Sequence, residues 1–315
     1  ETPREMTRKM TTWNQLHKEC VGIDKHRSEE SLAAALHRIK VLATYAHEVD
    51  VRTSRMNTPL HLACSQTSPD LIELLLSLGA NPSAENSTGE TPLHHCMMHG
   101  SLEMMDLLLD EEGVDVNKRD ATGCTPLHWA LQRPEPSLSL IERLLERGAN
   151  PNIPDENGDC PLHYAAQEGC LEAIDTLLMA GADATRVNQQ GFSPFHLACQ
   201  VGQRDVVEGF LELSESPLLV APSYQHHLTP LHLAARSESQ SVFDILLAVD
   251  GSFVSRPDAY GRTPLHIAAK EGNNYVASRL LEEGADRSAL DCFQRTPAQY
   301  AREGQHRDVV SLLGQ

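Results

Sequence analysis

Apolar and polar positions along this chain recur with a period of 33 to 36 residues. Most periods open with a hydroxyl residue, a proline, a leucine and a histidine, and small apolar residues follow, as in Tyr164-Ala165-Ala166. A glycine interrupts this run, and a second apolar run carries paired leucines. Because a hydroxyl oxygen caps a helix and proline fits its first turn, the pattern predicts two short helices in every period.

The opening tetrapeptide occurs seven times and once more in a degenerate form. The spacings between its copies are 33, 34, 35, 33, 36, 34 and 33 residues, which is too regular to be accidental. Glycines such as Gly79 and Gly148 suit a left-handed helix end, and polar links such as 120–123 predict hairpins. The first residues of the eight copies are Thr58, Thr91, Thr125, Cys160, Ser193, Thr229, Thr263 and Thr296.

The tetrapeptide and its period resemble the ankyrin repeat, whose signature is T-P-L-H-x-A at about 33 residues. The resemblance covers residues 53–315. It implies an all-α fold, an ankyrin-repeat solenoid of antiparallel helix pairs with projecting β-hairpin loops. Such repeats cannot bury their apolar faces alone, so each is stabilised by its neighbours.

The two ends of the array are expected to differ from its middle. Residues 1–52 are predicted to form N-terminal helices that act as a degenerate capping repeat, and 53–315 about eight repeats, the last a polar C-terminal cap. Ser28 is placed to cap a helix with an apolar stripe. The stripe residues are Leu32, Ala35, Leu36, Ile39 and Leu42, and an earlier set at helical spacing is Met6, Met10, Trp13, His17 and Cys20.

Charge divides the chain unevenly. The whole chain has 44 acidic and 26 basic residues, a net charge of −18. Residues 1–57 hold 10 basic and 8 acidic residues, whereas 58–315 hold 16 and 36, a net of −20. Phosphate affinity comes mainly from Lys and Arg, so direct nucleic-acid binding is not expected.

Composition also indicates in which cellular compartment the chain is expected. No run of 18 apolar residues occurs, so membrane insertion is not expected. Eight cysteines without C-x-x-C pairs suggest free thiols in a reducing compartment, the cytoplasm or the nucleus. The chain opens on Glu1 without a leader, and we expect a fragment of a longer protein.

Sixteen histidines raise the question of a metal site. Seven are the fourth residue of the tetrapeptide, one per repeat, and are too dispersed to share an ion. The resemblance implies that these imidazoles bridge backbone groups of neighbouring repeats. His95 and His99 have helical i, i+4 spacing, but no cysteine or carboxylate is evident beside them. No metal and no cofactor are therefore expected.

Cysteines and enzyme motifs give no catalytic site. Cys64, Cys96 and Cys199 replace small alanines of a first helix, where buried cysteine acts as a small hydrophobe. Cys124 and Cys292 lie on hairpins, where exposure is expected. The phosphate-binding loop, zinc-protease, nucleophile-elbow and kinase motifs are absent, so the chain is not expected to be an enzyme.

The resemblance indicates where a partner would bind, namely the hairpin tips and the concave surface of the first helices. Tip positions are taken as those just after the hairpin Asp and just before the tetrapeptide. We expect a basic or extended segment of another protein there, held by a monomeric chain. The candidate contacts are Met98, His99, Trp129, Glu156, Asp159, Tyr164, Glu168, Phe192, Tyr260, Arg262, Phe293 and Arg295.

Aromatic residues at these positions have two interpretations. Phe192, Tyr260 and Phe293 fit exposed anchors, since interfaces are enriched in aromatics. They equally fit rings folded back on neighbouring hairpins. Trp129 and Tyr164 follow the histidine, where Leu or Ile stands elsewhere, which favours packing over a groove-facing edge.

Irregular segments and one asparagine are further candidates. The segments 134–136, 214–228 and 250–253 depart from the repeat, and loops tolerate insertion and carry function; neutral drift explains them equally well. Asn117 resembles the position hydroxylated in some ankyrin proteins, which makes it a candidate modification site.

Two functions remain open at this stage. The first is a non-catalytic scaffold or adaptor that holds a partner along an acidic concave face. The second is a regulatory ankyrin domain cut from a larger protein, such as a channel or a modular enzyme. The sequence names neither the partner nor the pathway, because specificity lies in surface residues.

Overall fold

The computed structural model describes residues 14–21, 29–46, 49–66, 68–133, 136–213, 223, 226–237, 239–249 and 251–314. By its internal contacts the chain divides into unit 1, residues 1–156, and unit 2, residues 157–315. Within the described residues every regular element is helical, so the predicted all-α class is confirmed. Ser28, Met6, Met10 and Trp13 lie outside the described residues, as do 134–135, 214–222 and 250.

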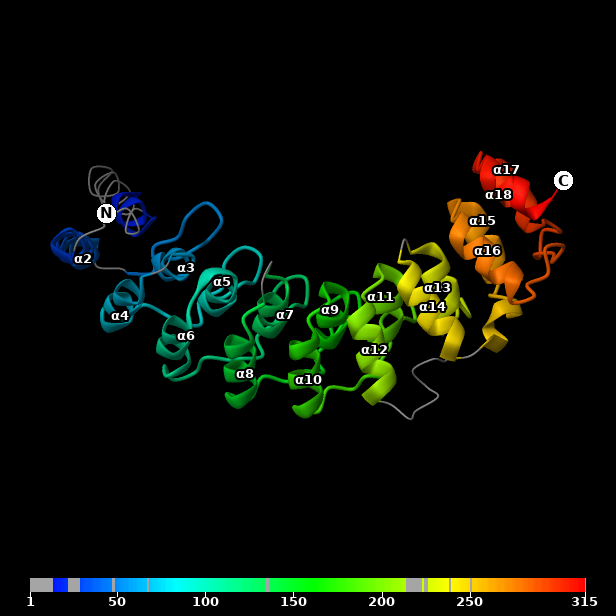
Figure 1. The fold of residues 1–315 in the computed structure, drawn as a ribbon. Helices are drawn as coiled ribbons and strands as arrows, with labels where there is room; N and C mark the ends of the chain where they lie inside the picture. The colour runs from blue at the N-terminus through cyan, green and yellow to red at the C-terminus, as the bar shows by residue number, and fades with distance from the viewer. Residues whose placement is uncertain are drawn as a thin grey trace. The chain divides into compact units, whose positions relative to one another are not determined.

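Unit 1 consists of helix pairs joined by hairpin loops (Figure 1). A helix over 14–21 precedes α2, Glu29–Ala46. First helices pack on first helices of the next repeat, α3 on α5 and α5 on α7, and second helices on second helices. The pairs are α3 Pro59–Cys64 with α4 Pro69–Ser77, α5 Pro92–His99 with α6 Leu102–Leu109, and α7 Pro126–Leu131 with α8 Leu138–Glu146.

Unit 2 repeats this design, and its first helices α9, α11, α13, α15 and α17 pack in series. The predicted antiparallel helix pairs are thus present in both units. The pairs are α9 Pro161–Glu168 with α10 Leu171–Met179, α11 Pro194–Val201 with α12 Arg204–Leu213, α13 Pro230–Arg236 with α14 Gln240–Val249, α15 Pro264–Glu271 with α16 Asn274–Glu282, and α17 Pro297–Glu303 with α18 Arg307–Leu313.

The tetrapeptide starts each first helix. Thr58 is the extended N-cap of α3, and Pro59 occupies the first helical position, where no N–H is required. The leucine and the small residues behind it face the core: Leu60, Ala63 and Cys64 are fully buried. A first helix inside a unit, such as α5 between α3 and α7, therefore packs against both neighbouring repeats, which is the source of the neighbour coupling expected of such arrays.

Hairpin loops connect the repeats and contact one another. Each is closed by a backbone bond, such as Asp120 N–H to the Cys124 carbonyl at 2.9 Å, and neighbouring tips are joined by another, Ala121 N–H to the Thr88 carbonyl at 2.8 Å. Gly123 has φ +79°, and a Cβ there would lie 2.8 Å from the amide nitrogen of Glu156. Only glycine fits this turn.

The N-terminal helices carry two features of a repeat. In the helix 14–21, Leu16 and Cys20 are fully buried, and Nε2 of His17 lies 3.1 Å from the Val51 carbonyl. This contact parallels the histidine bridges described below. In α2, Ala35 and Ile39 are fully buried.

One irregular segment has a structural explanation. Residues Gly251–Ser255 form the short 3-10 helix η2, which packs against α14 and α15. It buries Phe253 and Val254. The described part of the altered exit, residues 251–253, thus lies between two helices of unit 2.

Candidate interaction surface

The repeat histidines bridge neighbouring repeats, as the resemblance implied. Nε2 of His61 lies 3.0 Å from the Glu90 carbonyl, and Nδ1 accepts the backbone N–H of Thr58 at 3.2 Å. Since a carbonyl only accepts and an amide only donates, the ring is neutral with its proton on Nε2. Bridges of the same kind run from His94 to Cys124 (3.3 Å), from His163 to Phe192 (3.1 Å), from His232 to Arg262 (2.9 Å) and from His266 to Arg295 (3.1 Å).

Burial keeps these rings uncharged. It lowers the pKa of His61 and of His232 to about 4, against the hydrogen bond to a carbonyl, which favours the charged form. The same cause lowers the pKa of His94 and of His266. A neutral, doubly bonded imidazole has no lone pair left for a metal, so these histidines serve the fold.

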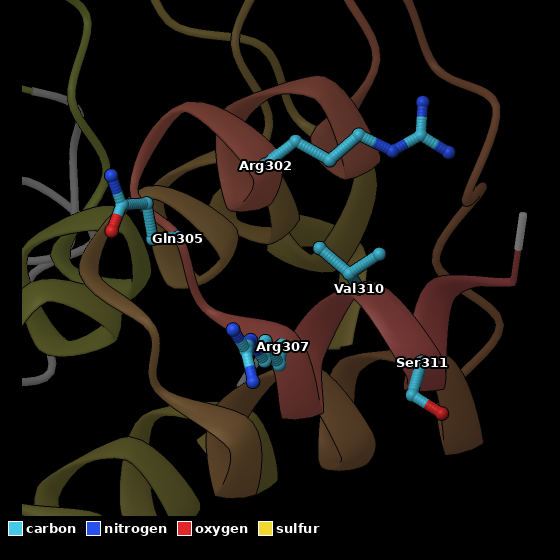
Figure 2. Close-up of a pocket in the computed structure, with 5 residues that line it drawn as sticks. All are labelled: Arg302, Gln305, Arg307, Val310 and Ser311. Carbon is cyan, nitrogen blue, oxygen red and sulfur yellow. The ribbon is translucent and has the colours of Figure 1, made fainter.

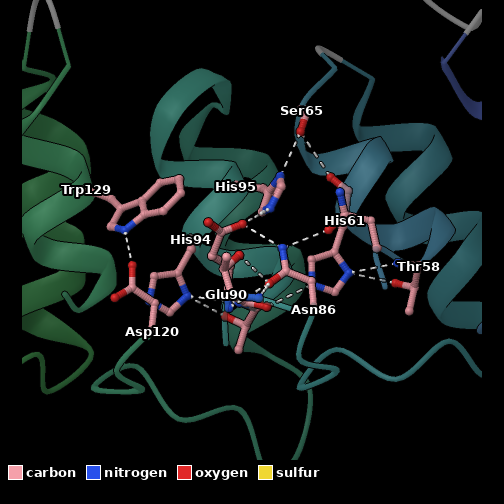
Figure 3. A network of polar contacts seen from close by, with 12 residues as sticks. Thr58, His61, Ser65, Asn86, Glu90, His94, His95, Asp120 and Trp129 are labelled. Atoms are coloured by element: carbon pink, nitrogen blue, oxygen red, sulfur yellow. Dashed lines mark hydrogen bonds and ion pairs between the residues drawn. The ribbon is translucent and has the colours of Figure 1, made fainter. Parts of the chain in front are cut away.

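His95 belongs to a polar network of unit 1 and not to a pair with His99. Its Nδ1 lies 3.0 Å from Ser65 Oγ, and its Nε2 lies 3.0 Å from Glu90 Oε2 (Figure 3). Burial would raise the pKa of Glu90, but hydrogen bonds from Asn86, Thr88 and His95 lower it. Across the described part of the chain, no three potential metal ligands gather at one point.

Trp129 closes the same network from the next repeat. Its Nε1–H donates to Asp120 Oδ2 at 2.9 Å, and its ring lies 5.6 Å from His94 and 6.1 Å from His95 (Figure 3). The indole is therefore held by packing and by one hydrogen bond, while part of it stays exposed. Tyr164 at the corresponding place in unit 2 is also partly exposed.

Phe192 is not an exposed tip, so the interpretation as an exposed anchor is wrong and the alternative, a ring folded back, applies to it. It is 7% exposed, and its ring lies 6.1 Å from that of His196. Cys124, also expected to be exposed, is buried. Both stand four residues after the hairpin Asp or Asn, where the backbone carbonyl lies within hydrogen-bond distance of the bridging histidine.

Residues two positions after the hairpin Asp or Asn point to solvent instead. Tyr260 is 44% exposed and Phe293 65%. Cys292, beside Phe293, is exposed as expected. In the other hairpins described, this position holds polar exposed residues, namely Thr88, Thr122, Asn157 and Gln190.

Arg262 and Arg295 are anchored inside their hairpins. Arg262 Nε donates to Asp258 Oδ2 at 2.7 Å, and Arg295 donates to Asp291 Oδ2 through Nε and Nη2 at 3.1 and 3.0 Å. Burial would raise the pKa of Asp291, yet hydrogen bonds, including those from Arg295 and Tyr300, lower it to about 2. The Asp291 carboxylate thus stays ionised beside Arg295.

The remaining candidates are arranged less specifically. On α5, Met98 is partly buried and His99 is exposed. Glu156 and Glu168 are exposed, while Asp159 accepts a hydrogen bond from Asn188 Nδ2 at 2.7 Å. Met98, His99 and Glu168 lie at the ends of first helices, whereas Glu156 and Asp159 lie in a hairpin.

Asn117 is tied into the fold. Its Nδ2 donates to the Gly148 carbonyl at 3.0 Å, and its Oδ1 accepts the Asn150 N–H at 2.7 Å. Its hydroxylation stays a prediction, and an enzyme that needs an extended asparagine must first break these two bonds.

The polar last repeat forms a hollow of about 600 Å³ in unit 2. Figure 2 shows the guanidinium groups of Arg302 and Arg307 directed apart, so they do not define a small-molecule site. Its lining residues are Arg302, Gln305, Arg307, Val310 and Ser311.

Sequence reasoning missed the contacts that span two repeats. The pairs Glu90–His95 and Asp120–Trp129 were not foreseen, although an aspartate nine residues before an aromatic donor recurs as Asp291–Tyr300. The spacing Asp-x-aromatic-x-Arg at 258–262 and 291–295 was the signal for the arginine–ring contacts.

Known proteins place the chain in a family. A family model described as ankyrin repeats (3 copies) matches residues 31–120, 60–155, 112–188, 133–221 and 231–315. Curated relatives include the ankyrin repeat protein nuc-2 of Neurospora crassa, 31% identical over 255 residues, which are 81% of this chain and 20% of that protein. Another is the B-cell lymphoma 3 protein homolog of Mus musculus, 33% identical over 46% of this chain and 33% of that protein.

A channel is also among the relatives. The human transient receptor potential cation channel subfamily A member 1 is 28% identical over 79% of this chain and 26% of that protein. The chain therefore spans only a fifth to a third of the length of these relatives. In the described part of the chain, no helix is long and apolar enough to cross a membrane. The repeat spacing, the histidine bridges and the family model agree, and the chain belongs to the ankyrin repeat family.

Proposed function

We propose that this chain is a non-catalytic scaffold that binds a partner protein through its hairpin tips and the concave face of its first helices. The observation that carries the proposal is the charge distribution. Residues 58–250 contain 28 acidic and 8 basic residues, a net of 8 − 28 = −20. An extended basic segment is the partner chemistry that complements this charge.

The distribution of polar contacts supports a role for the surface. The repeat histidines and hairpin aspartates are engaged in contacts that hold the helices and loops. Glu156, Glu168 and His99 are exposed, and other residue types stand at the corresponding positions of other repeats. Binding residues of a rigid scaffold are expected at such positions.

We propose that the candidate residues make different kinds of contact with the partner. Glu156, Asp159 and Glu168 orient a basic segment by charge. Met98, His99, Trp129 and Tyr164 supply first-helix contacts, and the apolar anchors are Tyr260 and Phe293, with Arg262 and Arg295 beside them. The buried ring of Phe192 has no place in this set. We further propose that residues 1–52 cap the array and that the chain acts as a monomer in the cytoplasm or the nucleus.

The test is a pull-down with mass spectrometry followed by association kinetics of the recovered partner. Raising salt from low to physiological concentration should slow the on-rate several-fold and leave the off-rate nearly fixed, because steering acts on encounter. Glu156→Gln with Glu168→Gln should weaken this salt dependence. A partner whose association is insensitive to salt contradicts the proposal.

A second function is favoured by one observation. Because the chain spans a fifth to a third of relatives that include a channel, the alternative is a regulatory ankyrin domain of a larger protein. Sequencing the full-length transcript tests it. A reading frame that adds a channel or catalytic domain supports it, and a frame limited to the repeats excludes it.

A further inference from the structure

Neighbouring hairpins in unit 2 expose apolar side chains, which the attraction of a basic partner by acidic residues does not explain. Tyr260, Leu290 and Phe293 expose 44%, 51% and 65% of their surface. We call these three residues the tip patch. Their hairpins are joined directly, because the Cys292 N–H donates to the Tyr260 carbonyl at 2.9 Å. The same kind of bond, from the Ala259 N–H to the His226 carbonyl at 2.9 Å, joins the preceding tip.

The two rings of the tip patch are held from the side of their own hairpins. The guanidinium of Arg262 lies 5.0 Å from the Tyr260 ring centre, and that of Arg295 lies 5.1 Å from the Phe293 ring centre. His226 stacks on Tyr260 with ring centres 6.3 Å apart. Rings fixed in this way lose little freedom on binding, which favours affinity.

Each arginine beside the patch already has a carboxylate partner. Arg262 pairs with Asp258 and Arg295 with Asp291, whose side chains are fully buried, and Arg295 Nη1 also lies 3.6 Å from the exposed Glu303 Oε2. A partner cation over these rings would meet a guanidinium already in place, while a partner anion would meet an arginine whose charge is balanced. Residues 251–315 hold 8 basic and 8 acidic residues, unlike the net −20 of residues 58–250.

We propose that the tip patch binds an extended, uncharged segment of a partner protein through two apolar side chains that cover Tyr260 and Phe293. The inference rests on the proposed function, since it requires a protein partner, and it adds a second contact of different chemistry. The acidic part of the chain selects basic residues. The tip patch selects aromatic or aliphatic residues and gains nothing from charge.

The experiment uses a random twelve-residue phage-display library selected on the whole chain. Wild type is compared with the double variant Tyr260→Ser, Phe293→Ser. The matched control is Met179→Ser, since Met179 is 91% exposed on α10 of the same unit and lies outside the patch. Peptides that depend on the patch should carry two apolar residues and a net charge near zero. Their Kd should rise at least about tenfold in the double variant and less than about twofold in the control.

Two outcomes overturn the proposal. One is that no selected peptide depends on Tyr260 and Phe293, and the other is that the dependent peptides are enriched in Lys and Arg. Thermal melting checks the fold of each variant, and the single variant Phe293→Ser replaces the double one if the latter melts early. Failure here leaves the salt-dependent on-rate of a basic partner untouched, so it is distinguishable from failure of the proposed function.

Discussion

Two hairpins, 120–124 in unit 1 and 291–295 in unit 2, share one frame and present different surfaces. In both, the Oδ1 atom of the aspartate accepts hydrogen bonds from the backbone N–H groups two and four residues later. These bonds measure 2.8 and 2.9 Å for Asp120, and both measure 2.8 Å for Asp291. In both, Oδ2 accepts from an aromatic donor nine residues later, Trp129 at 2.9 Å or Tyr300 at 2.8 Å.

The difference lies at two positions. Two residues after the aspartate stands Thr122 in one hairpin and Phe293 in the other, and both are exposed. Four residues after it stands the buried Cys124 or the ring-clamping Arg295. The frame is therefore set by the aspartate and the donors around it, while these two residues decide which side chains the hairpin exposes to solvent.

The largest expected effect comes from removing the frame itself. Asp291→Ala leaves Arg295, Tyr300 and two backbone N–H groups without their acceptor, and it should lower the free energy of unfolding by about 2–3 kcal/mol. Asp120→Ala should cost about 1–2 kcal/mol, because its hairpin holds no arginine on that carboxylate. Urea unfolding measures both values, and equal losses contradict the role given to Arg295.

A smaller loss is expected at a bridging histidine. His163→Ala removes the bond to the Phe192 carbonyl and should cost about 1–2 kcal/mol. His163→Gln should cost less, since in the eighth copy Gln299 Oε1 accepts the Thr296 N–H at 2.7 Å. A chelator should change neither the melting temperature nor binding. Stoichiometric zinc in the purified protein, measured by elemental analysis, would show that the structural interpretation is wrong.

The pH dependence of stability should be the same in both units. The folded pKa values of His61 and His232 are about 4, below the ordinary 6.5, so the unfolded state binds more protons between these values. Stability should therefore fall as the pH is lowered from about 6.5 to about 4. The melting temperature should depend less steeply on pH over this range in His61→Gln and in His232→Gln, to a similar extent. An unchanged slope in either variant contradicts the neutral-bridge assignment.

The sequence predicts the features that lie within one repeat better than the contacts between residues far apart in the chain. The helix pairs and the glycine turns were predictable because each is set within one repeat, and the histidine bridges were implied by the resemblance to ankyrin repeats. The direction of Phe192 was not predictable, since its ring packs beside that of His196 on the following helix. The stacking of Trp129 on His95 joins residues 34 positions apart, so no local pattern announces it.

We expect the hairpin aspartates and their donors to stabilise the repeats, and the exposed hairpin positions to bind the partner. The most direct measurement is partner affinity and melting temperature for Tyr260→Ala, Phe293→Ala, Met98→Ala and Trp129→Ala. Tyr260→Ala and Phe293→Ala should each keep the melting temperature within a few degrees and weaken binding by about 1–3 kcal/mol. Normal binding by both, together with abolished binding by folded Met98→Ala or Trp129→Ala, would place the interface in unit 1 and contradict the claim.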